Sequence, residues 1–302
     1  MTSGPLDPPQ LANPRAERVR AVRGLSARSA RSRRGRFVAE GPQAVGEAVA
    51  AHAAAVAEGL PGVILDLYVG PEAQTRHAEL LARAAAVAER PRPATAEVLD
   101  AMAGTVHPQG LLAVCARRLH TLDEVVATRP RLVAVLAQVR DPGNAGTVIR
   151  TADAAGAEAV VLAGASVDPY NAKCVRATAG SLFHLPVVAG VGLVEAVSRL
   201  RGAGLTILAA DAAGERDLDE LIDDAEAGRA GGLAGPVAWV FGNEAWGLPG
   251  PDRGLADATV RVRMDGPAES LNLSSAAAIC LYASARAQRR AGETRRPAGD
   301  GI

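Results

Sequence analysis

Short apolar runs alternate with stretches of helical spacing along the second half of the chain. The run at residues 132–138 is almost continuously apolar, as expected for a strand buried on both faces of a parallel sheet. Further strands are predicted at residues 158–163, 183–188, 205–210, 236–241 and 258–262, and helices at 145–155, 172–179, 193–201 and 271–291. This alternation predicts an α/β fold, with a mostly parallel sheet and helices on both faces.

The first half repeats this alternation on a smaller scale. An arginine-rich helix is predicted through about residue 34, followed by strands at 37–41, 63–69 and 110–116 and helices at 43–58, 72–89 and 95–102. We therefore predict two domains. The first domain, at residues 1–116, is a basic N-terminal arm with a small α/β domain, and it begins with a flexible lead at 1–13. A linker at 117–130 joins it to a larger second domain at 131–292, and a flexible tail follows at 293–302.

Charge is unevenly distributed, although the 302-residue chain has a net charge of zero. Residues 1–36 carry nine arginines against two carboxylates. A block of this kind favours contact with nucleic acid, and a solvated arm without a partner is the alternative.

The number and spacing of the cysteines, and the lengths of the apolar runs, indicate the cellular compartment in which the protein is expected. Cys115, Cys174 and Cys280 are odd in number and far apart, so neither a disulfide framework nor a zinc site is predicted. No apolar run reaches the roughly 18 residues of a membrane span, and the N-terminus lacks the pattern of a signal peptide. We expect a cytoplasmic protein without a metal ion and without a membrane partner.

Three polar segments, two of which contain glycine, follow predicted strands or open predicted helices. They are residues 141–152 (DPGNAGTVIRTA), 241–248 (FGNEAWGL) and 269–275 (ESLNLSS). In an open α/β sheet, ligands bind at the carboxyl ends of the strands, so the three segments together suggest one composite site.

Each segment also has a purely structural interpretation. Asn144 suits a helix N-cap, Arg150 a surface position and Trp246 a core plug. Ser270 and Asn272 could cap the last helix, although capping needs only one such side chain. The chain lacks GxGxxG after the first strand of the second domain, a Walker loop and the acidic GxGxG loop of a Rossmann-type methyltransferase, which argues against those classes.

Taken together, these segments resemble the signature of the SpoU (TrmH-like) family of RNA ribose 2′-O-methyltransferases. The matching patterns are Asn144-x-Gly146-x-x-x-Arg150, Phe241-Gly-x-Glu244-x-x-Gly-Leu248, Met264-x-Gly266-x-x-Glu-Ser-Leu-Asn272, and Asp168-Pro-Tyr-Asn-Ala-Lys173-x-x-Arg176-Ala-x-Ala-Gly180. Residues 36–41 resemble the family's N-terminal substrate-binding domain. The chain departs from the usual pattern at residues 262–264, where Val-Arg-Met replaces Ile-Pro-Met, and at Ala177 or Ala179, where serine is usual.

The resemblance implies a C-terminal trefoil knot, a rare feature, which binds S-adenosylmethionine, and a homodimer formed across it. By position in the motifs, the backbones of Gly242, Val262 and Leu271 would contact the methyl donor. Met264, Ser270 and the stretch that includes Leu208 and Ala210 would line the same pocket. The catalytic set would be Arg150, Asn144, Glu244, Ser270 and Asn272.

The predicted activity is therefore S-adenosylmethionine-dependent 2′-O-methylation of structured RNA. Ribosomal RNA is favoured, and transfer RNA is the alternative. No metal is required, because a sulfonium is already a good electrophile. Arg150 could activate the ribose hydroxyl, or it could clamp a phosphate and stabilise developing alkoxide. A non-catalytic RNA-binding protein with this fold would be expected to lack Arg150, Glu244 or Asn272, and the chain has all three.

Overall fold

The computed structural model describes residues 11–87, 91–105, 107–229 and 232–295, and these fall into two compact units. Among the described residues, the first unit comprises those between 11 and 118 and at 170–184, and the second comprises those at 119–169 and between 185 and 295. Most of the predicted flexible lead, residues 1–10, lies outside the described residues, as do residues 296–302 of the predicted tail. The segment 170–184 belongs with the first unit, although the sequence pattern grouped it with the second.

The first unit has a four-stranded sheet in the order β1-β4-β2-β3. Its elements are α1 (Glu17–Arg23), η1 (Gly24–Ser26), α2 (Arg28–Arg34), β1 (Arg36–Glu40), α3 (Pro42–Ala57), β2 (Ile64–Val69), α4 (Pro71–Arg76), α5 (Ala78–Val87), β3 (Arg92–Pro93), α6 (Ala96–Met102), β4 (Leu111–Ala116), α9 (Ala172–Thr178) and η2 (Ser181–Phe183). Strand β4 pairs antiparallel with β1 and β2, and β2 pairs parallel with β3.

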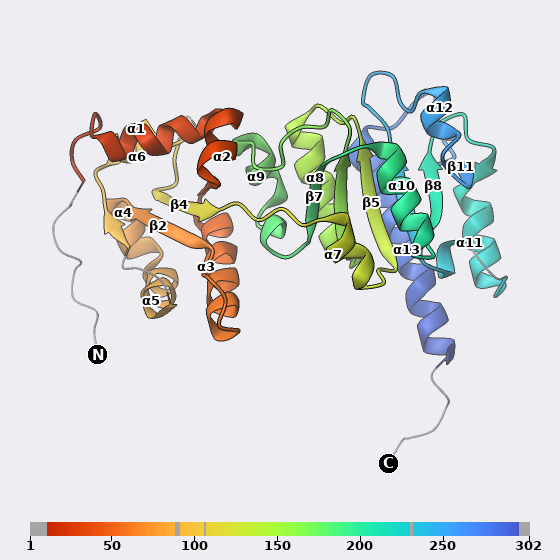
Figure 1. The fold of residues 1–302 in the computed structure, drawn as a ribbon, viewed down its shortest axis with the longest axis horizontal. Helices are drawn as coiled ribbons and strands as arrows, with labels where there is room; N and C mark the ends of the chain where they lie inside the picture. The colour runs from red at the N-terminus through yellow and green to blue at the C-terminus, as the bar shows by residue number, and fades with distance from the viewer. Residues whose placement is uncertain (1–10, 88–90, 106, 230–231, 296–302) are drawn as a thin grey trace, which may run out of the picture. The chain divides into compact units, whose positions relative to one another are not determined.

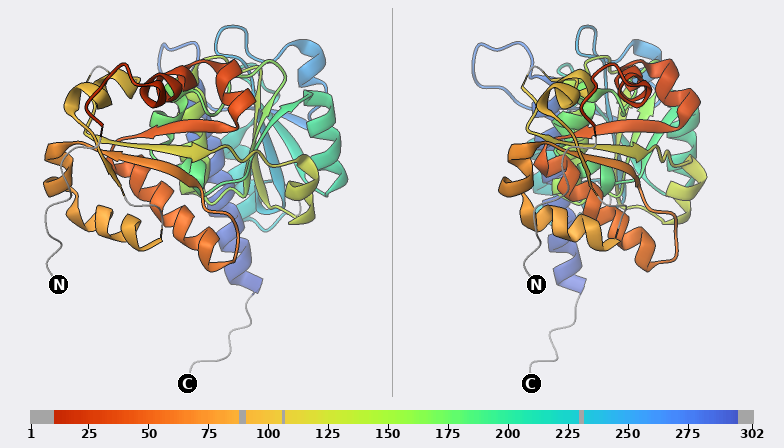
Figure 2. Two further views of the ribbon diagram at one scale, coloured as in Figure 1. Left: turned by 60° about the vertical axis from the view of Figure 1, so that its left-hand side comes forward. Right: turned by 90° about the vertical axis from the view of Figure 1, so that its left-hand side faces the viewer.

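Helices cover both faces of this sheet. Residues of α1 and α6 pack with Tyr68, Leu112 and Val114 in one core cluster. Figure 2 shows α1 on one side of the sheet, with α3 and α5 on the other. Helix α9 packs against β1, where the rings of Phe37 and Tyr170 lie 4.6 Å apart.

The second unit has a seven-stranded sheet in the order β7-β6-β5-β10-β8-β11-β9 (Figure 1). Its elements are α7 (Leu122–Ala127), β5 (Leu132–Ala137), α8 (Pro142–Ala155), β6 (Ala159–Ala163), β7 (Val187–Val191), α10 (Leu193–Gly202), β8 (Thr206–Ala210), β9 (Arg216–Asp217), α11 (Leu218–Glu226), η3 (Gly232–Ala234), β10 (Val237–Phe241), α12 (Gly250–Arg253), β11 (Ala258–Arg261) and α13 (Leu273–Arg295). Every described strand pair in this sheet is parallel, which explains the unbroken apolar runs.

Alternation along β10 shows how the two faces are covered. Ala238 and Val240 belong to the core cluster that contains residues of α7 and α10. Trp239 between them points the other way, and its indole Nε1 donates a 2.8 Å hydrogen bond to Ser284 Oγ of α13. Helices α8 and α13 pack against each other, so the sheet has helices on both faces, as the sequence predicted.

The register brings three strand ends to one place. Phe241, the last residue of β10, is paired with Leu136 of β5 on one side and with Ala210, the last residue of β8, on the other. Strand order also changes direction at β5, since β6 lies on one side of it and β10 on the other. Such a switch point is where ligands bind in open α/β sheets.

Several predicted elements differ from the observed ones. The predicted linker contains helix α7, which begins with a capping box between Thr121 and Glu124, and this pattern is visible in the sequence. The strand predicted at 183–188 is wrong in its position, because Pro186 follows the 3₁₀ turn η2 and β7 starts at Val187. The helix predicted at 72–89 is broken at His77, and the arginine-rich helix is two helices separated by η1.

No helix in the described ranges has both the length and the apolar character needed to cross a bilayer. Within the same residues, no group of three or more His, Cys, Asp or Glu side chains could hold a metal ion.

Candidate active site

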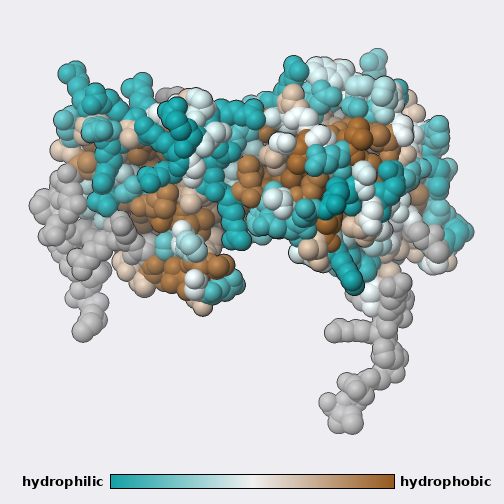
Figure 3. Space-filling view, viewed as in Figure 1, coloured by the Kyte–Doolittle hydropathy of each residue, from teal (hydrophilic) through white to brown (hydrophobic). Residues whose placement is uncertain are grey.

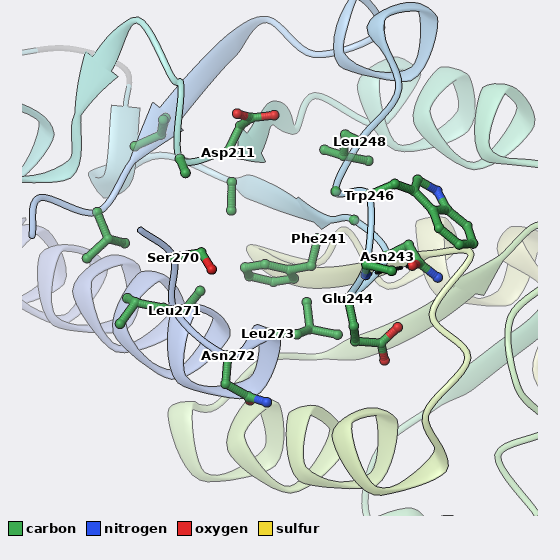
Figure 4. Close-up of a pocket in the computed structure, with 18 of the residues that line it drawn as sticks. Asp211, Phe241, Asn243, Glu244, Trp246, Leu248, Ser270, Leu271, Asn272 and Leu273 are labelled. Atoms are coloured by element: carbon green, nitrogen blue, oxygen red, sulfur yellow. Dashed lines mark hydrogen bonds between the residues drawn. The ribbon is translucent and has the colours of Figure 1, made fainter. Parts of the chain in front are cut away.

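A cavity of about 550 Å³ opens at the carboxyl ends of β8, β10 and β11 (Figure 4). Five of the six residues predicted to bind the methyl donor line it, and they are Ala210, Gly242, Val262, Met264 and Leu271. The sixth, Leu208, lies in the sheet core with 2% of its surface exposed and is not part of the lining. Ser270 and Leu271 lie at one side of the cavity, and Trp246 and Glu244 at the other.

The loop after β10 is folded back on itself. The backbone N–H groups of Asn243 and Gly247 each donate to the carbonyl oxygen of the other, at 2.9 Å. Gly247 has a φ of +64°, which suits glycine, and Asn243 Oδ1 accepts a hydrogen bond from the Ala245 N–H. A Cβ at Gly242 would lie 2.4 Å from the carbonyl carbon of Gly247, so only glycine fits at the base of this loop.

Glu244 holds the start of α8. Its carboxylate accepts hydrogen bonds from the backbone N–H of Arg140 at 3.3 Å and of Asp141 at 3.2 Å. Asn243 adds a 2.7 Å bond from Nδ2 to the carbonyl oxygen of Gln138. The loop after β10 is therefore tied by three hydrogen bonds to the loop after β5.

Asn144 joins all three polar segments. Its Nδ2 donates to Glu244 Oε1 at 3.4 Å, and its Oδ1 accepts from Asn272 Nδ2 at 3.2 Å. The residue type of Asn144 suggested an N-cap, but Asn144 is not the N-cap of α8. That position is held by Asp141, whose carboxylate accepts from the Asn144 N–H at 2.8 Å.

Asn272 also serves the last helix. Its Oδ1 accepts from the N–H of Ser274 at 2.8 Å, and its carbonyl oxygen accepts from the N–H of Ala276. These bonds satisfy amides at the start of α13. Ser270, two residues earlier, is exposed and faces the cavity.

Arg150 lies on the exposed face of α8, one turn beyond Thr147 and opposite the buried residues Val148 and Ile149. It does not line the cavity, and Glu244 is bonded to backbone amides rather than to Arg150. Across the described residues, Arg150 has no ion pair or side-chain hydrogen bond, so its guanidinium is available to an external anion.

Three features of the site were missed by sequence reasoning. Arg253 lines the cavity and lies 3.5 Å from Asp211 Oδ2. Trp246 is not a core plug, because 48% of its surface is exposed, and Arg140 lies over its ring. In a chain with 33 basic residues, nothing in the sequence distinguishes Arg140 or Arg253 from the other arginines.

Comparison with known proteins identifies the two parts of the chain. Residues 131–282 match the SpoU rRNA Methylase family, and residues 16–113 match the MRM3-like substrate binding domain. The chain is 37% identical over 186 residues to the 23S rRNA guanosine 2′-O-methyltransferase RlmP of Bacillus subtilis, covering 62% of this chain and 68% of RlmP. It is 32% identical to the 23S rRNA guanosine-2′-O-methyltransferase RlmB of Bordetella pertussis, covering 75% of this chain and 90% of RlmB.

Solved structures agree with this assignment. The AdoMet-bound rRNA methyltransferase of Sinorhizobium meliloti superposes with a TM-score of 0.75 and 28% identity, covering 91% of this chain and 97% of that one. AviRb of Streptomyces viridochromogenes in complex with AdoMet gives a TM-score of 0.74 and 28% identity, covering 91% and 99%.

The parallel sheet, the cavity at its carboxyl edge and these similarities define an RNA methyltransferase. Within that class, the chain belongs to the SpoU rRNA methylase family.

Proposed function

We propose that this protein methylates the 2′-hydroxyl of a ribose in ribosomal RNA, with S-adenosylmethionine as the methyl donor. The observation that carries the proposal is the hydrogen-bonded chain Glu244–Asn144–Asn272, which joins three distant polar segments beside one cavity. The relatives named for activity on 23S rRNA support ribosomal RNA as the substrate.

The cavity suits the donor in size and in chemistry. A volume of about 550 Å³ is within the usual range for small-molecule sites. Val262, Met264 and Leu271 offer apolar surface, and the carboxylates of Asp211 and Glu244 are compatible with a cationic ligand. We assign the backbones of Gly242, Val262 and Leu271, with Ala210 and Met264, to donor binding. When bound there, S-adenosylmethionine supplies an electrophilic methyl group.

The residues of this chain must orient the ribose and manage its charge. We propose that Arg150, which stays protonated as arginines do, binds an RNA phosphate and stabilises the alkoxide character that develops on the 2′-oxygen. Its exposure and lack of a partner among the described residues support this role over that of a proton acceptor. Asn144 and Asn272 would position the ribose, Ser270 would complete the pocket, and Glu244 would hold the loops in register.

Three further properties are proposed from the family resemblance. The chain between β10 and α13 would pass through a trefoil knot, two copies would associate through the second unit, and the protein would work in the cytoplasm. Analytical ultracentrifugation of the purified protein tests the dimer, with a monomer at all concentrations as the contradicting result.

The substrate assignment is tested by transfer of labelled methyl from S-adenosylmethionine to unmodified ribosomal RNA and, separately, to unmodified transfer RNA. We expect label in ribosomal RNA, within dinucleotides that resist alkaline hydrolysis, because a methylated 2′-oxygen cannot attack the adjacent phosphate. Label in transfer RNA alone would assign the alternative substrate. Label in alkali-sensitive mononucleotides would indicate base methylation and contradict the proposal.

A further inference from the structure

An exposed tryptophan lies at the rim of the cavity. Trp246 follows the Asn243–Glu244 pair, lines the cavity and has 48% of its surface exposed (Figure 4). An exposed indole at the rim of a ligand site presents a large, rigid aromatic surface to whatever binds there. The other tryptophan, Trp239, has 0% exposure and is bonded to Ser284 in the core.

A cation accompanies the exposed ring. The guanidinium carbon of Arg140 lies 5.0 Å from the ring centroid of Trp246, within the range of a cation–π interaction. Arg140 is itself exposed, and no carboxylate of the described residues forms an ion pair with it. The guanidinium lies over the indole ring, so the pair combines an exposed aromatic ring with a positive charge that has no carboxylate partner among the described residues.

The two residues are also held in place. Arg140 lies in the loop after β5 and Trp246 in the loop after β10, and hydrogen bonds from Asn243 and to Glu244 tie these loops together. The loop that carries Trp246 is closed by its own pair of backbone bonds between Asn243 and Gly247. A preorganised surface of this kind loses little freedom when a ligand binds.

We propose that Trp246 and Arg140 form a stacking platform for a nucleobase of the substrate RNA beside the methylated ribose. The inference rests on the proposed function, because it requires RNA at this cavity. Unpaired bases stack on aromatic rings and arginine planes in RNA-binding proteins, and a cation beside the ring suits the neighbouring phosphate. Placing the base on this surface would hold its ribose against the cavity, where the methyl group is transferred.

Tryptophan emission tests the contact directly. The chain has two tryptophans, and only Trp246 is accessible to a stacking base. We expect a mixed-sequence single-stranded oligoribonucleotide to quench the accessible emission, and Trp246→Phe to abolish that change. If S-adenosylhomocysteine alone quenches Trp246 to the same extent and the oligoribonucleotide adds nothing, the ring covers the donor and the proposal is wrong.

Steady-state methylation provides the second test. We expect Trp246→Ala to raise KM for ribosomal RNA about tenfold or more with a smaller change in kcat, since one stacked base contributes on that scale. Trp246→Phe keeps a stacking ring and should stay within about threefold of wild type, and Arg140→Ala should fall between the two. The matched control is Arg289→Ala, which removes an exposed arginine 5.9 Å from the Tyr282 ring and outside the cavity.

The outcomes separate this inference from the proposed function. If wild-type protein methylates ribosomal RNA and Trp246→Ala has an unchanged KM, the platform is wrong and the function stands. If wild-type protein methylates no RNA, the function itself fails. A Trp246→Ala variant that loses self-association, as measured by sedimentation, and keeps its affinity for RNA would assign the ring to a protein interface and overturn the proposal.

Discussion

The polar groups of the second unit's cavity and the arginines of the first unit's N-terminal helices are organised in opposite ways. Around the cavity, Glu244, Asn144 and Asn272 are bonded mainly to one another and to loop amides. In the first unit, two of the arginine side chains donate hydrogen bonds to backbone carbonyl oxygens and so stabilise the fold. Arg31 has 2% exposure and donates to the carbonyl oxygens of Leu25 and Ser26, and Arg34 donates to that of Ala21.

The remaining arginines of this region form an exposed basic surface. Figure 3 shows hydrophilic residues gathered over α1 and α2. The exposed arginines without a described bond to a backbone carbonyl are Arg15, Arg18, Arg20, Arg23, Arg28, Arg33 and Arg36. The excess of arginine in the first unit therefore marks an exposed surface, whereas the polar residues that bond to one another at the strand ends of the second unit mark a binding site.

Replacing Gly242 by alanine should have the largest effect. The new Cβ would lie 2.4 Å from the Gly247 carbonyl carbon, so the loop must move away from the cavity. We expect S-adenosylmethionine binding, measured by calorimetry, to weaken about a hundredfold. Gly250→Ala is the matched control, because a Cβ there meets no atom within 4 Å. Equal binding by both variants would show that the loop conformation does not shape the cavity.

Glu244→Gln tests the bond network with almost no change in shape. The amide keeps one acceptor for the N–H groups of Arg140 and Asp141 but loses the charge that strengthens both bonds. We expect kcat/KM for RNA methylation to fall about ten- to thirtyfold, from roughly 1.5–2 kcal/mol. Glu195→Gln, an exposed carboxylate of α10, should leave the rate unchanged, and a similar loss in both would reject a specific role for Glu244.

Substitution of two arginines in the first unit distinguishes a role in stability from a role in RNA binding. Arg31→Met should lower the free energy of unfolding by about 2 kcal/mol, because one buried and one partly buried carbonyl group lose a charged donor. Arg33→Ala, two residues away and exposed, should leave chemical denaturation unchanged and weaken RNA binding severalfold, with a shallower salt dependence. If Arg33→Ala lowered the free energy of unfolding and Arg31→Met weakened only RNA binding, both role assignments would be wrong.

The thiols should behave alike in both units. Burial raises the pKa of Cys280 to about 12 and also raises the pKa of the Cys115 thiol, so both are neutral at pH 8. We expect no reaction with a thiol reagent at this pH until the protein unfolds. The pKa of Cys280 is higher in the folded protein than in the unfolded chain, where it is 9.0. The unfolded chain therefore loses the thiol proton first, so the free energy of unfolding is unaffected below pH 9 and falls as the pH rises toward 12. Rapid labelling of either thiol in folded protein would contradict the burial.

Much of the second unit could be predicted from its pattern. The apolar runs identify β5, β6 and β10, because each of these strands is buried along its whole length and is built from apolar residues. Strands β8 and β11 were also predicted, although each contains a threonine and β11 is only partly buried. Strand β9 was missed, since a two-residue strand has no periodicity of its own. Helix α11 was missed although its buried residues Leu218 and Leu221 have helical spacing. The 170–184 segment could not be assigned to the first unit, because its contacts with β1 are distant in sequence.

The sequence indicated most of the residues that line the cavity, but not the hydrogen bonds that join them. The polar segments were identifiable from residue type and position, and most of the assigned donor residues line one cavity. The Asn144–Asn272 bond joins residues more than a hundred positions apart, so no local pattern contains it. The exposure of Trp246 depends on how its loop folds back, which is a tertiary property.

Arg150 is proposed to act on the RNA and not on the methyl donor. The most direct test measures S-adenosylmethionine binding by calorimetry and single-turnover methyl transfer to unmodified ribosomal RNA, for wild type, Arg150→Ala and the control Arg289→Ala. We predict that Arg150→Ala binds the donor with wild-type affinity and transfers methyl at least about a hundredfold more slowly, as expected for loss of a charge that stabilises developing oxyanion. Wild-type transfer by Arg150→Ala, or a loss of donor binding that accounts for its slower transfer, would contradict the account.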